Sequence, residues 1–293
     1  MAQPNYRSRV SIGLPVFNGE KYLPQTIESL LAQTFDDFEL IISDNASTDR
    51  TAEICRAYAE RDARVRYHRN EANIGLYRNF NRVFQLSSSA YFKWAAADDI
   101  CGARLIERCV EVLDADPQAV LVYAKTVFID EQQRELVVDY PGWHLPSPDP
   151  VERMAFAIQA GHWVTACEGL IRSSALRQTP LFPTYYGGDR ALLCRLALFG
   201  TFQELPERLA FKRLHASNST GHASDADWFP DKAAYQSWTL YRDYLKIIAG
   251  SPFSLSQKTR LLKAAARRMY WSKSSLRQEM RQYVRNVLRS GDS

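Results

Sequence analysis

The sequence predicts an α/β protein with a mainly parallel central sheet flanked by helices. Over the first 130 residues, short β-rich apolar runs alternate with stretches whose apolar residues recur at helical spacing. Turn residues or polar clusters separate the two kinds of segment. The order strand, helix, strand, helix is typical of a parallel sheet, because parallel neighbours need a crossover connection between them.

The first predicted strand is 10–17 (VSIGLPVF), and the turn signal Asn18-Gly19 follows it. An amphipathic helix is expected over 22–34, where leucine and isoleucine recur at helical spacing. The second predicted strand is 38–44 (FELIISD). Polar cap residues then indicate a helix from about 50 to 62.

The alternation continues in the next part of the chain. A third strand is predicted at 65–70, a third helix at 76–87 and a fourth strand at 90–96. A helix near 105–113 and a strand at 120–130 complete the regular pattern.

The remaining chain is less regular. The Pro-rich segment 140–151 predicts a loop over the ligand crevice, followed by a helix near 151–160. The run 166–176 is predicted to be a strand that enters a helix, and Gly187-Gly188-Asp189 opens another helix. From about 225 to 289 the pattern is helical.

Polar residues follow three of the predicted strands, at Asn18-Gly19, Asp44-Asn45 and Asp98-Asp99. In parallel α/β sheets, ligands bind beyond the carboxyl ends of the strands. The three clusters are therefore expected to meet at one crevice.

The stretch 92–100, FKWAAADDI, ends an apolar run with two adjacent carboxylates, Asp98 and Asp99. Adjacent like charges repel, so a positive group must offset them. A divalent cation that also binds phosphate oxygens would do so, and Mg²⁺ and Mn²⁺ both accept carboxylate and phosphate oxygen. The alternative is that the pair begins a solvated turn or caps the helix that follows.

Composition describes a soluble globular protein without an expected membrane span. The 293 residues fit one large domain, or one domain with an appendage. The five cysteines are scattered and lack metal-ligand spacing, which favours reduced thiols in a cytosol. The first residues do not resemble a signal peptide. We therefore expect a cytoplasmic protein, or one peripheral to the inner membrane face.

Several motifs together resemble the family 2 glycosyltransferases, which have the GT-A fold. They are the opening segment from VSIGLPVFNGEKYL to IISDNASTDRT, then NEANIGLYRNFN, the Ala-Asp-Asp turn, GGDRALLCRLALFG and FKRLHASNS. The match covers roughly residues 9–220 in order and spacing. The resemblance implies an inverting transfer of a sugar from a nucleotide-diphosphate donor, usually with Mn²⁺ or Mg²⁺.

The resemblance also implies a donor site. Pro15 and Phe17 would line the base pocket, with Phe17 against the nucleobase. Asp44 would accept a hydrogen bond from the base, which suits the imide N–H of uracil or thymine. Arg78 would lie near the base or the diphosphate.

Four further residues would serve the reacting end of the donor. Asp98 would approach the ribose or the metal shell, and Asp99 would bind the metal directly. His215 matches a position that contacts the metal or the diphosphate in some members. Asp189 matches the general base, and the helix dipole is expected to favour its charged form. Many members have a further acidic residue where this chain has Ala96, which implies weak affinity for free metal.

Each of these assignments has a structural alternative. Asp44 could form an Asx turn, and Asp189 could only cap a helix. His215 could be a buried structural histidine, and Arg78 could pair with a surface carboxylate.

The domain organisation is predicted as a catalytic domain over 1–224, with a nucleotide-binding half at about 1–130 and an acceptor half at about 131–224. A basic helical extension would follow at 225–293. Its segment 257–293 has ten Lys or Arg against two acidic residues, a net charge of +8.

Apolar residues recur at helical spacing in this segment, opposite the cations. Such a helix could lie on an anionic membrane surface, or its apolar stripe could pack on the catalytic domain or on a second subunit of a homodimer. Nucleic acid is not expected as a partner, because aromatic residues are not interleaved with the basic face.

The sequence therefore predicts a glycosyltransferase that moves a sugar from a UDP- or dTDP-sugar to a hydroxyl of a saccharide or lipid-linked acceptor, in polysaccharide or glycoconjugate synthesis. One alternative is a non-catalytic protein that binds sugar nucleotides. Another is a sugar nucleotidyltransferase, although GLPVFNGEKY lacks the Gly-rich basic loop of that class. A dehydrogenase would need G-x-G-x-x-G, which Gly13 and Gly19 do not supply.

Overall fold

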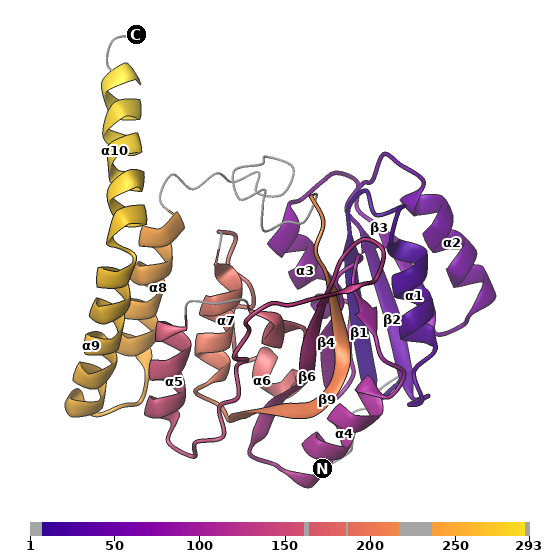
Figure 1. Ribbon diagram of the computed structural model, residues 1–293, viewed down its shortest axis with the longest axis horizontal. Coiled ribbons are helices and arrows are strands. Elements are labelled where there is room, and N and C mark those ends of the chain that lie inside the picture. Colours follow the sequence, from indigo (N-terminus) through magenta and orange to yellow (C-terminus); the bar gives the residue numbers. More distant parts are fainter. Residues whose placement is uncertain (1–7, 161–163, 186, 217–235, 291–293) are drawn as a thin grey trace.

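A twisted mixed sheet runs through the centre of the molecule, with helices on both of its faces (Figure 1). The computed structural model describes residues 8–160, 164–185, 187–216 and 236–290, without the side chains of 236 and 282–290. In spatial order the strands are β3 (Val65–Arg69), β2 (Phe38–Asp44), β1 (Val10–Val16), β4 (Tyr91–Trp94), β8 (Leu170–Arg172), β6 (Ala119–Ile129), β9 (Thr201–Arg213) and β5 (Ile100–Cys101). A short β7 (Glu135–Leu136) pairs with β6 off this path.

The four strands from β3 to β4 are parallel, as the alternating pattern predicts. Beyond them the sheet becomes mixed, because β8 runs antiparallel to both β4 and β6. Strand β9 is parallel to β6 and antiparallel to β5. The mainly parallel sheet of the prediction is therefore correct for the amino-terminal half, and the remainder is mixed.

Ten helices lie in the described part of the chain, besides the 3₁₀ turn η1 (Thr165–Glu168). Six of them precede α7, and four belong to the last third of the chain. They are α1 (Leu23–Leu31), α2 (Thr51–Arg61), α3 (Leu76–Gln85), α4 (Leu105–Ala115), α5 (Pro150–Gln159), α6 (Ser173–Leu176), α7 (Gly188–Leu196), α8 (Gln236–Gly250), α9 (Leu255–Trp271) and α10 (Lys273–Ser290).

Two apolar cores cover the two faces of the sheet. Alternate residues of β1, such as Ile12 and Leu14, pack against α1, α2 and α4. The larger core on the other face joins α3 to α5, α7, α8 and α9. Gly13 faces this second side, where a Cβ would lie 2.5 Å from the Phe92 ring, so the close approach of α3 and β4 requires glycine.

The long strand β9 is not predicted by its pattern, because charged residues and Pro206 interrupt it. It pairs with β6 in two stretches separated by a register shift between Ala124 and Thr126. The second stretch brings the end of β9 beside β5, close to the turn that follows β4. This strand therefore delivers the residues around 212–215 to the centre of the molecule.

The Pro-rich segment 140–151 was predicted to cover the crevice, but it packs elsewhere. Trp143 is fully buried in the larger core, and Leu145 pairs with Phe202 of β9. Asp149 caps α5 by accepting a hydrogen bond from the backbone N–H of Val151.

The carboxyl-terminal helices are part of the larger core. Leu261, Ala264 and Ala265 of α9 are buried, and Leu276 of α10 joins them. For these residues of the apolar stripe, packing within the chain is the alternative found, whereas Met280 of α10 is 43% exposed. No helix in the described ranges is long and apolar enough to cross a bilayer.

We expect Leu261→Ala to lower the free energy of unfolding by about 2 to 5 kcal/mol, because it leaves a cavity in the shared core. Chemical denaturation followed by circular dichroism measures this. Leu262→Ala is the matched control, since Leu262 is 43% exposed, and it should change the value by no more than about 0.5 kcal/mol. Equal effects of the two substitutions would show that α9 does not pack as described.

Candidate functional site

A cavity of about 440 Å³ lies at the carboxyl ends of the strands. Five strands each contribute a lining residue just beyond their end: Phe17 after β1, Asn45 after β2, Asp98 after β4, Glu131 after β6 and His215 after β9. The volume falls within the range typical of small-molecule sites, roughly 300 to 1,000 Å³. The predicted crevice therefore exists, and more strand ends meet there than the sequence indicated.

One end of the cavity is mainly apolar. Pro15 and Phe17, both predicted to line a base pocket, do line this cavity, and Leu76 and Phe80 of α3 lie across from them. Flat apolar side chains suit the faces of an aromatic ligand. Arg78, on the same helix, is exposed and does not line the cavity.

A buried network of asparagine amides supports this apolar end. Asn45 Oδ1 accepts hydrogen bonds from Asn70 Nδ2 and from the backbone N–H of Ile74, both at 3.0 Å. Asn79 accepts from Asn70 at 3.0 Å and from Ser43 at 2.7 Å. These bonds join the ends of β2 and β3 to α3 and fix the loop between them. The density of asparagine in NEANIGLYRNFN was the signal for this role, and sequence reasoning did not use it.

Asp44 lies behind the cavity wall. Its side chain is fully buried, and its Oδ1 accepts a hydrogen bond from the backbone N–H of Ser47 at 2.8 Å. Its Oδ2 accepts from Tyr67 at 2.8 Å and from Arg69 at 2.9 Å. A contact between Asp44 and a base, as the resemblance implies, would require these partners to release the carboxylate.

Asp98 and His215 form the polar end of the cavity. His215 Nε2 lies 2.9 Å from Asp98 Oδ2, and it donates the hydrogen bond because an ionised carboxylate only accepts. Burial raises the pKa of Asp98, but the bond from His215 and the charge of Lys212 outweigh it, so the pKa is lower than usual. Asp98 therefore stays ionised at neutral pH.

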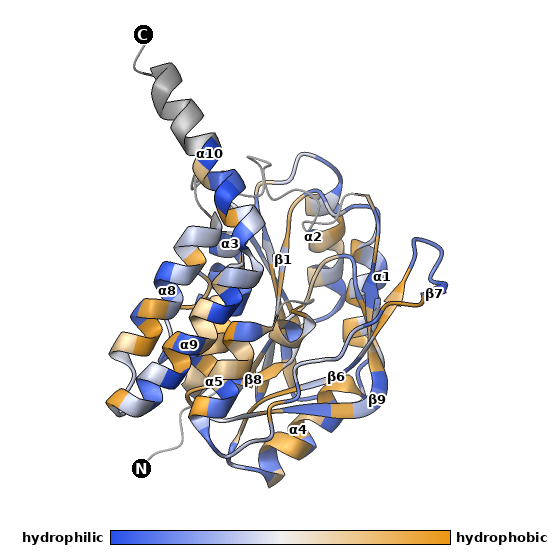
Figure 2. Ribbon diagram, turned by 60° about the vertical axis from the view of Figure 1, so that its left-hand side comes forward, coloured by the Kyte–Doolittle hydropathy of each residue, from blue (hydrophilic) through white to orange (hydrophobic). Residues whose placement is uncertain are grey.

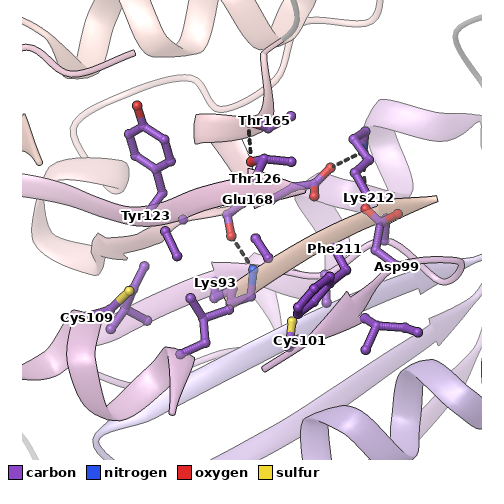
Figure 3. Close-up of a pocket in the computed structure, with 18 of the residues that line it drawn as sticks. Lys93, Asp99, Cys101, Cys109, Tyr123, Thr126, Thr165, Glu168, Phe211 and Lys212 are labelled. Carbon is purple, nitrogen blue, oxygen red and sulfur yellow. Dashed lines mark hydrogen bonds and ion pairs between the residues drawn. The ribbon is translucent and has the colours of Figure 1, made fainter. Parts of the chain in front are cut away.

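Asp99, the neighbouring carboxylate, points away from this cavity and into a separate one of about 30 Å³, room for a single water molecule. Lys212 Nζ donates to Asp99 Oδ2 at 3.2 Å and to Glu168 Oε1 at 3.0 Å, as Figure 3 shows. Burial and the charges of Asp98 and Glu168 together raise the pKa of Asp99 against the opposing charge of Lys212. The repulsion between Asp98 and Asp99 is thus offset by a lysine that sequence reasoning missed.

Arg213 is the second cation that sequence reasoning missed. Its backbone N–H donates to Asp99 Oδ1 at 2.8 Å, and its guanidinium donates to the backbone carbonyl of Asp98 at 2.9 Å. The same guanidinium reaches Gln25 of α1 at 3.0 Å and stacks on Tyr22 at 4.7 Å from the ring centre. This fully buried side chain fixes the turn that carries both carboxylates.

Asp189 is the second residue of α7, after Gly187 in the left-handed conformation (φ 89°). Its Oδ1 accepts a hydrogen bond from the backbone N–H of Arg190 at 2.8 Å. Burial raises its pKa, and the charge of Glu168 raises it further, which outweighs Arg190 and the backbone. The backbone N–H groups at the start of α7 favour the charged form of Asp189, and burial outweighs their effect on its pKa. Asp189 does not line the cavity, but it lies close enough to Glu168 for the charge of Glu168 to raise its pKa.

The polar end fits a divalent cation in part. Asp98 offers a carboxylate oxygen, and His215 Nε2 would ligate a cation only in the tautomer that carries the proton on Nδ1, which gives up the hydrogen bond to Asp98. Within the described ranges, no group of three or more His, Cys, Asp or Glu side chains could hold a metal. A cation here would need oxygen atoms from a bound ligand.

Three comparisons with known proteins agree on one kind of molecule. The family model described as glycosyl transferase family 2 matches residues 11–177. An uncharacterized glycosyltransferase of Rickettsia prowazekii, RP339, is 28% identical over 226 residues, 76% of this chain and 69% of its own. A second, RT0329 of Rickettsia typhi, is 32% identical over 46% of this chain, and the match spans only 42% of that protein.

Solved structures share the fold. S. aureus TarS 1-349 in complex with UDP-GlcNAc has a TM-score of 0.70 at 17% identity, covering 89% of this chain and 72% of its own. The mannosyltransferase PcManGT from Pyrobaculum calidifontis, in complex with GDP-Man and Mn²⁺, has a TM-score of 0.59 at 16% identity, covering 98% and 82%. The α/β architecture is therefore that of GT-A glycosyltransferases.

We expect Lys212→Met to lower the free energy of unfolding by about 3 kcal/mol, because it removes the cation that pairs with both Asp99 and Glu168. Urea denaturation at neutral pH measures the change. Lys125→Met, at an exposed position of β6, is the control and should be nearly neutral. Adding Asp99→Asn to Lys212→Met should restore part of the loss, and a double variant less stable than Lys212→Met would contradict the pairing.

Proposed function

The chain belongs to glycosyl transferase family 2, and from this premise we propose that it moves a sugar, with inversion, from a UDP- or dTDP-sugar to a hydroxyl of a saccharide or lipid-linked acceptor. The observation that carries the proposal is that the cavity of about 440 Å³ has one apolar end and one polar end. Its apolar end, around Phe17, suits a nucleobase, and its end at Asp98 and His215 suits a diphosphate with a cation.

The charges around the cavity support a cation-dependent donor. Its charged lining residues are Lys21, Asp98 and Glu131, with His215 beside them. Lys21 is paired with Glu131 at 2.7 Å and Asp98 with His215 at 2.9 Å, and Lys21, Asp98 and Glu131 together carry a net charge of −1, one positive and two negative. A nucleotide diphosphate is itself negative and would be repelled. Mn²⁺ or Mg²⁺, held by Asp98 and His215 with diphosphate oxygens, would supply the charge that stabilises the leaving group.

This assigns the direct metal contact to Asp98 rather than to Asp99. Asp99 is engaged by Lys212 and by the backbone of Arg213, so its role is to hold the turn. A uridine nucleotide is supported by TarS, whose structure contains UDP-GlcNAc, whereas the more distant PcManGT contains GDP-Man. Pro15 and Phe17 would contact the base, with Asp44 and the asparagine network supporting that wall from behind.

Asp189 would act as the general base. It would accept the proton of the acceptor hydroxyl while that oxygen attacks the anomeric carbon and the bond to the diphosphate oxygen breaks. Attack from the face opposite the leaving group inverts the configuration, so an α-linked donor gives a β-linked product. A pKa raised by burial brings the carboxylate closer to working pH, which makes it a stronger base once ionised.

We expect Asp98→Asn to remove most of the Mn²⁺-dependent gain in UDP affinity, a loss of about 10- to 100-fold for a charged partner worth roughly 1.5 to 3 kcal/mol. Asp99→Asn should keep that gain and lose stability instead. Titration calorimetry with UDP and with GDP, with and without Mn²⁺, measures both effects and the base preference. If only Asp99→Asn lost the Mn²⁺-dependent gain in UDP affinity, the residue that contacts the metal would be Asp99.

We expect Asp189→Asn to lower the transfer rate by about 10²- to 10⁴-fold with UDP affinity unchanged. Because the pKa of Asp189 is raised, the wild-type rate should fall as pH drops through a value above the usual Asp range, and the variant should lack this acid limb. Asp243→Asn is the control, since Asp243 pairs with Arg195 in the helical layer and should affect stability alone. Equal transfer by wild type and Asp189→Asn would mean that the base is elsewhere, or that the protein only binds donors.

A further inference from the structure

The packing of α9 and α10 determines which surface of these two helices is exposed and can bind a partner. Of the apolar stripe, Leu261, Ala265 and Leu276 are buried inside the chain, whereas Met280 of α10 is 43% exposed. The exposed cations lie opposite the buried residues. Figure 2 colours the described start of α10, residues 273–281, mainly hydrophilic, and Figure 1 shows that the helix projects beyond the rest of the molecule.

We call this surface the basic face. It consists of five exposed cations and two exposed aromatic residues between positions 263 and 281 of both helices: Lys263, Arg267, Tyr270, Trp271, Lys273, Arg277 and Arg281. The two helices are nearly continuous, since Ser272 N–H donates to Arg268 O and Leu276 N–H donates to Ser272 O, both at 3.1 Å. At 1.5 Å per residue, the basic face extends over roughly 27 Å.

The cations of the basic face have no carboxylate partners among the described residues. Those nearer the start of α9 do have partners: Arg260 approaches Asp149 and Glu152, and Lys258 donates to Ala249 O. The one acidic residue of the described part of α9 and α10, Glu279, accepts a hydrogen bond from Ser237 in α8. The positive charge of the basic face is thus not neutralised within the chain.

Two large aromatic side chains lie at the centre of the basic face. Tyr270 is 65% exposed and Trp271 is 50% exposed. Lys273 lies 4.2 Å from the Tyr270 ring centre, and Arg267 lies 4.9 Å from that of Trp271. An exposed tryptophan and tyrosine among cations are typical of the boundary between lipid headgroups and acyl chains, where an apolar ring and a polar edge are both satisfied.

We propose that the basic face binds the surface of an anionic lipid bilayer. Clustered cations beside a membrane are attracted by its negative surface potential, and the aromatic pair adds an apolar contact at headgroup depth. The exposed Tyr270 and Trp271 correct the sequence interpretation that no aromatic residues lie among these cations. Single-stranded nucleic acid would also use the cations and stack on the two rings, so its binding is one outcome of the test. The proposal is independent of the donor chemistry.

The test uses the full chain with vesicles of equal parts phosphatidylglycerol and phosphatidylcholine, and with phosphatidylcholine alone. Wild type should co-float with the anionic vesicles only, and rising salt should release it. Each cation is worth about fivefold in binding, so Lys263→Gln, Lys273→Gln and Arg277→Gln together should weaken it about 100-fold. The control is Arg56→Gln, Arg61→Gln and Lys125→Gln, which removes the same charge from exposed positions elsewhere.

A spin-labelled headgroup lipid should quench the tryptophan fluorescence of wild type more than that of Trp271→Phe. The substituted residues are exposed, so the melting temperature of each variant should equal that of wild type. A lower melting temperature would reveal a variant that misfolds. Equal vesicle binding by the two triple variants would overturn the proposal. Failure of wild type to bind anionic vesicles would also overturn the proposal. Light scattering would then test for self-association, and a binding assay would test for nucleic acid as the partner instead.

Discussion

Two adjacent carboxylates can follow β4 because β9 brings two cations to the same turn. Lys212 lies between Asp99 and Glu168, and Arg213 holds the turn through the backbone of Asp98 and the side chain of Asp99. Because of these contacts, the neighbouring residues Asp98 and Asp99 lie in different environments. Asp98 keeps its negative charge and faces the cavity with His215, while Asp99 is buried behind it. The polar end of the cavity depends on this arrangement.

The two ends of the cavity are stabilised by different chemistry. Amide groups of Asn45, Asn70 and Asn79 fix the apolar end through hydrogen bonds that add no net charge. Ion pairs fix the polar end, where charge is needed. Asp189 does not line the cavity and lies on α7, a helix that pairs with α8 through Arg195 and Asp243. The carboxyl-terminal helices therefore support the proposed base as well as completing the core.

Regular elements with strong periodicity were predictable from the sequence, and contacts between distant segments were not. Strands β1 to β4 and β6 and the crevice at their ends follow from local patterns, whereas the two-residue β5 was not predicted. Strand β9 was missed because Pro206 and alternating charges conceal a pairing that two separate neighbours create. Asp98 and Asp99 could not be distinguished, since only the partners from β9 decide which one faces the cavity. Asp44 was placed correctly at a strand end, but Tyr67 and Arg69 of β3 bury its carboxylate.

The separation along the chain between the turn and its cations has a consequence for folding. The contacts of Asp99 with Arg213 and of Asp98 with His215 join residues 114 and 117 positions apart. Contacts of such high sequence separation form late, because loop closure must precede them. During synthesis, the parallel strands can assemble while the polar end is still missing. The protein can therefore bind a charged ligand only after most of the polypeptide has been made and these contacts have formed.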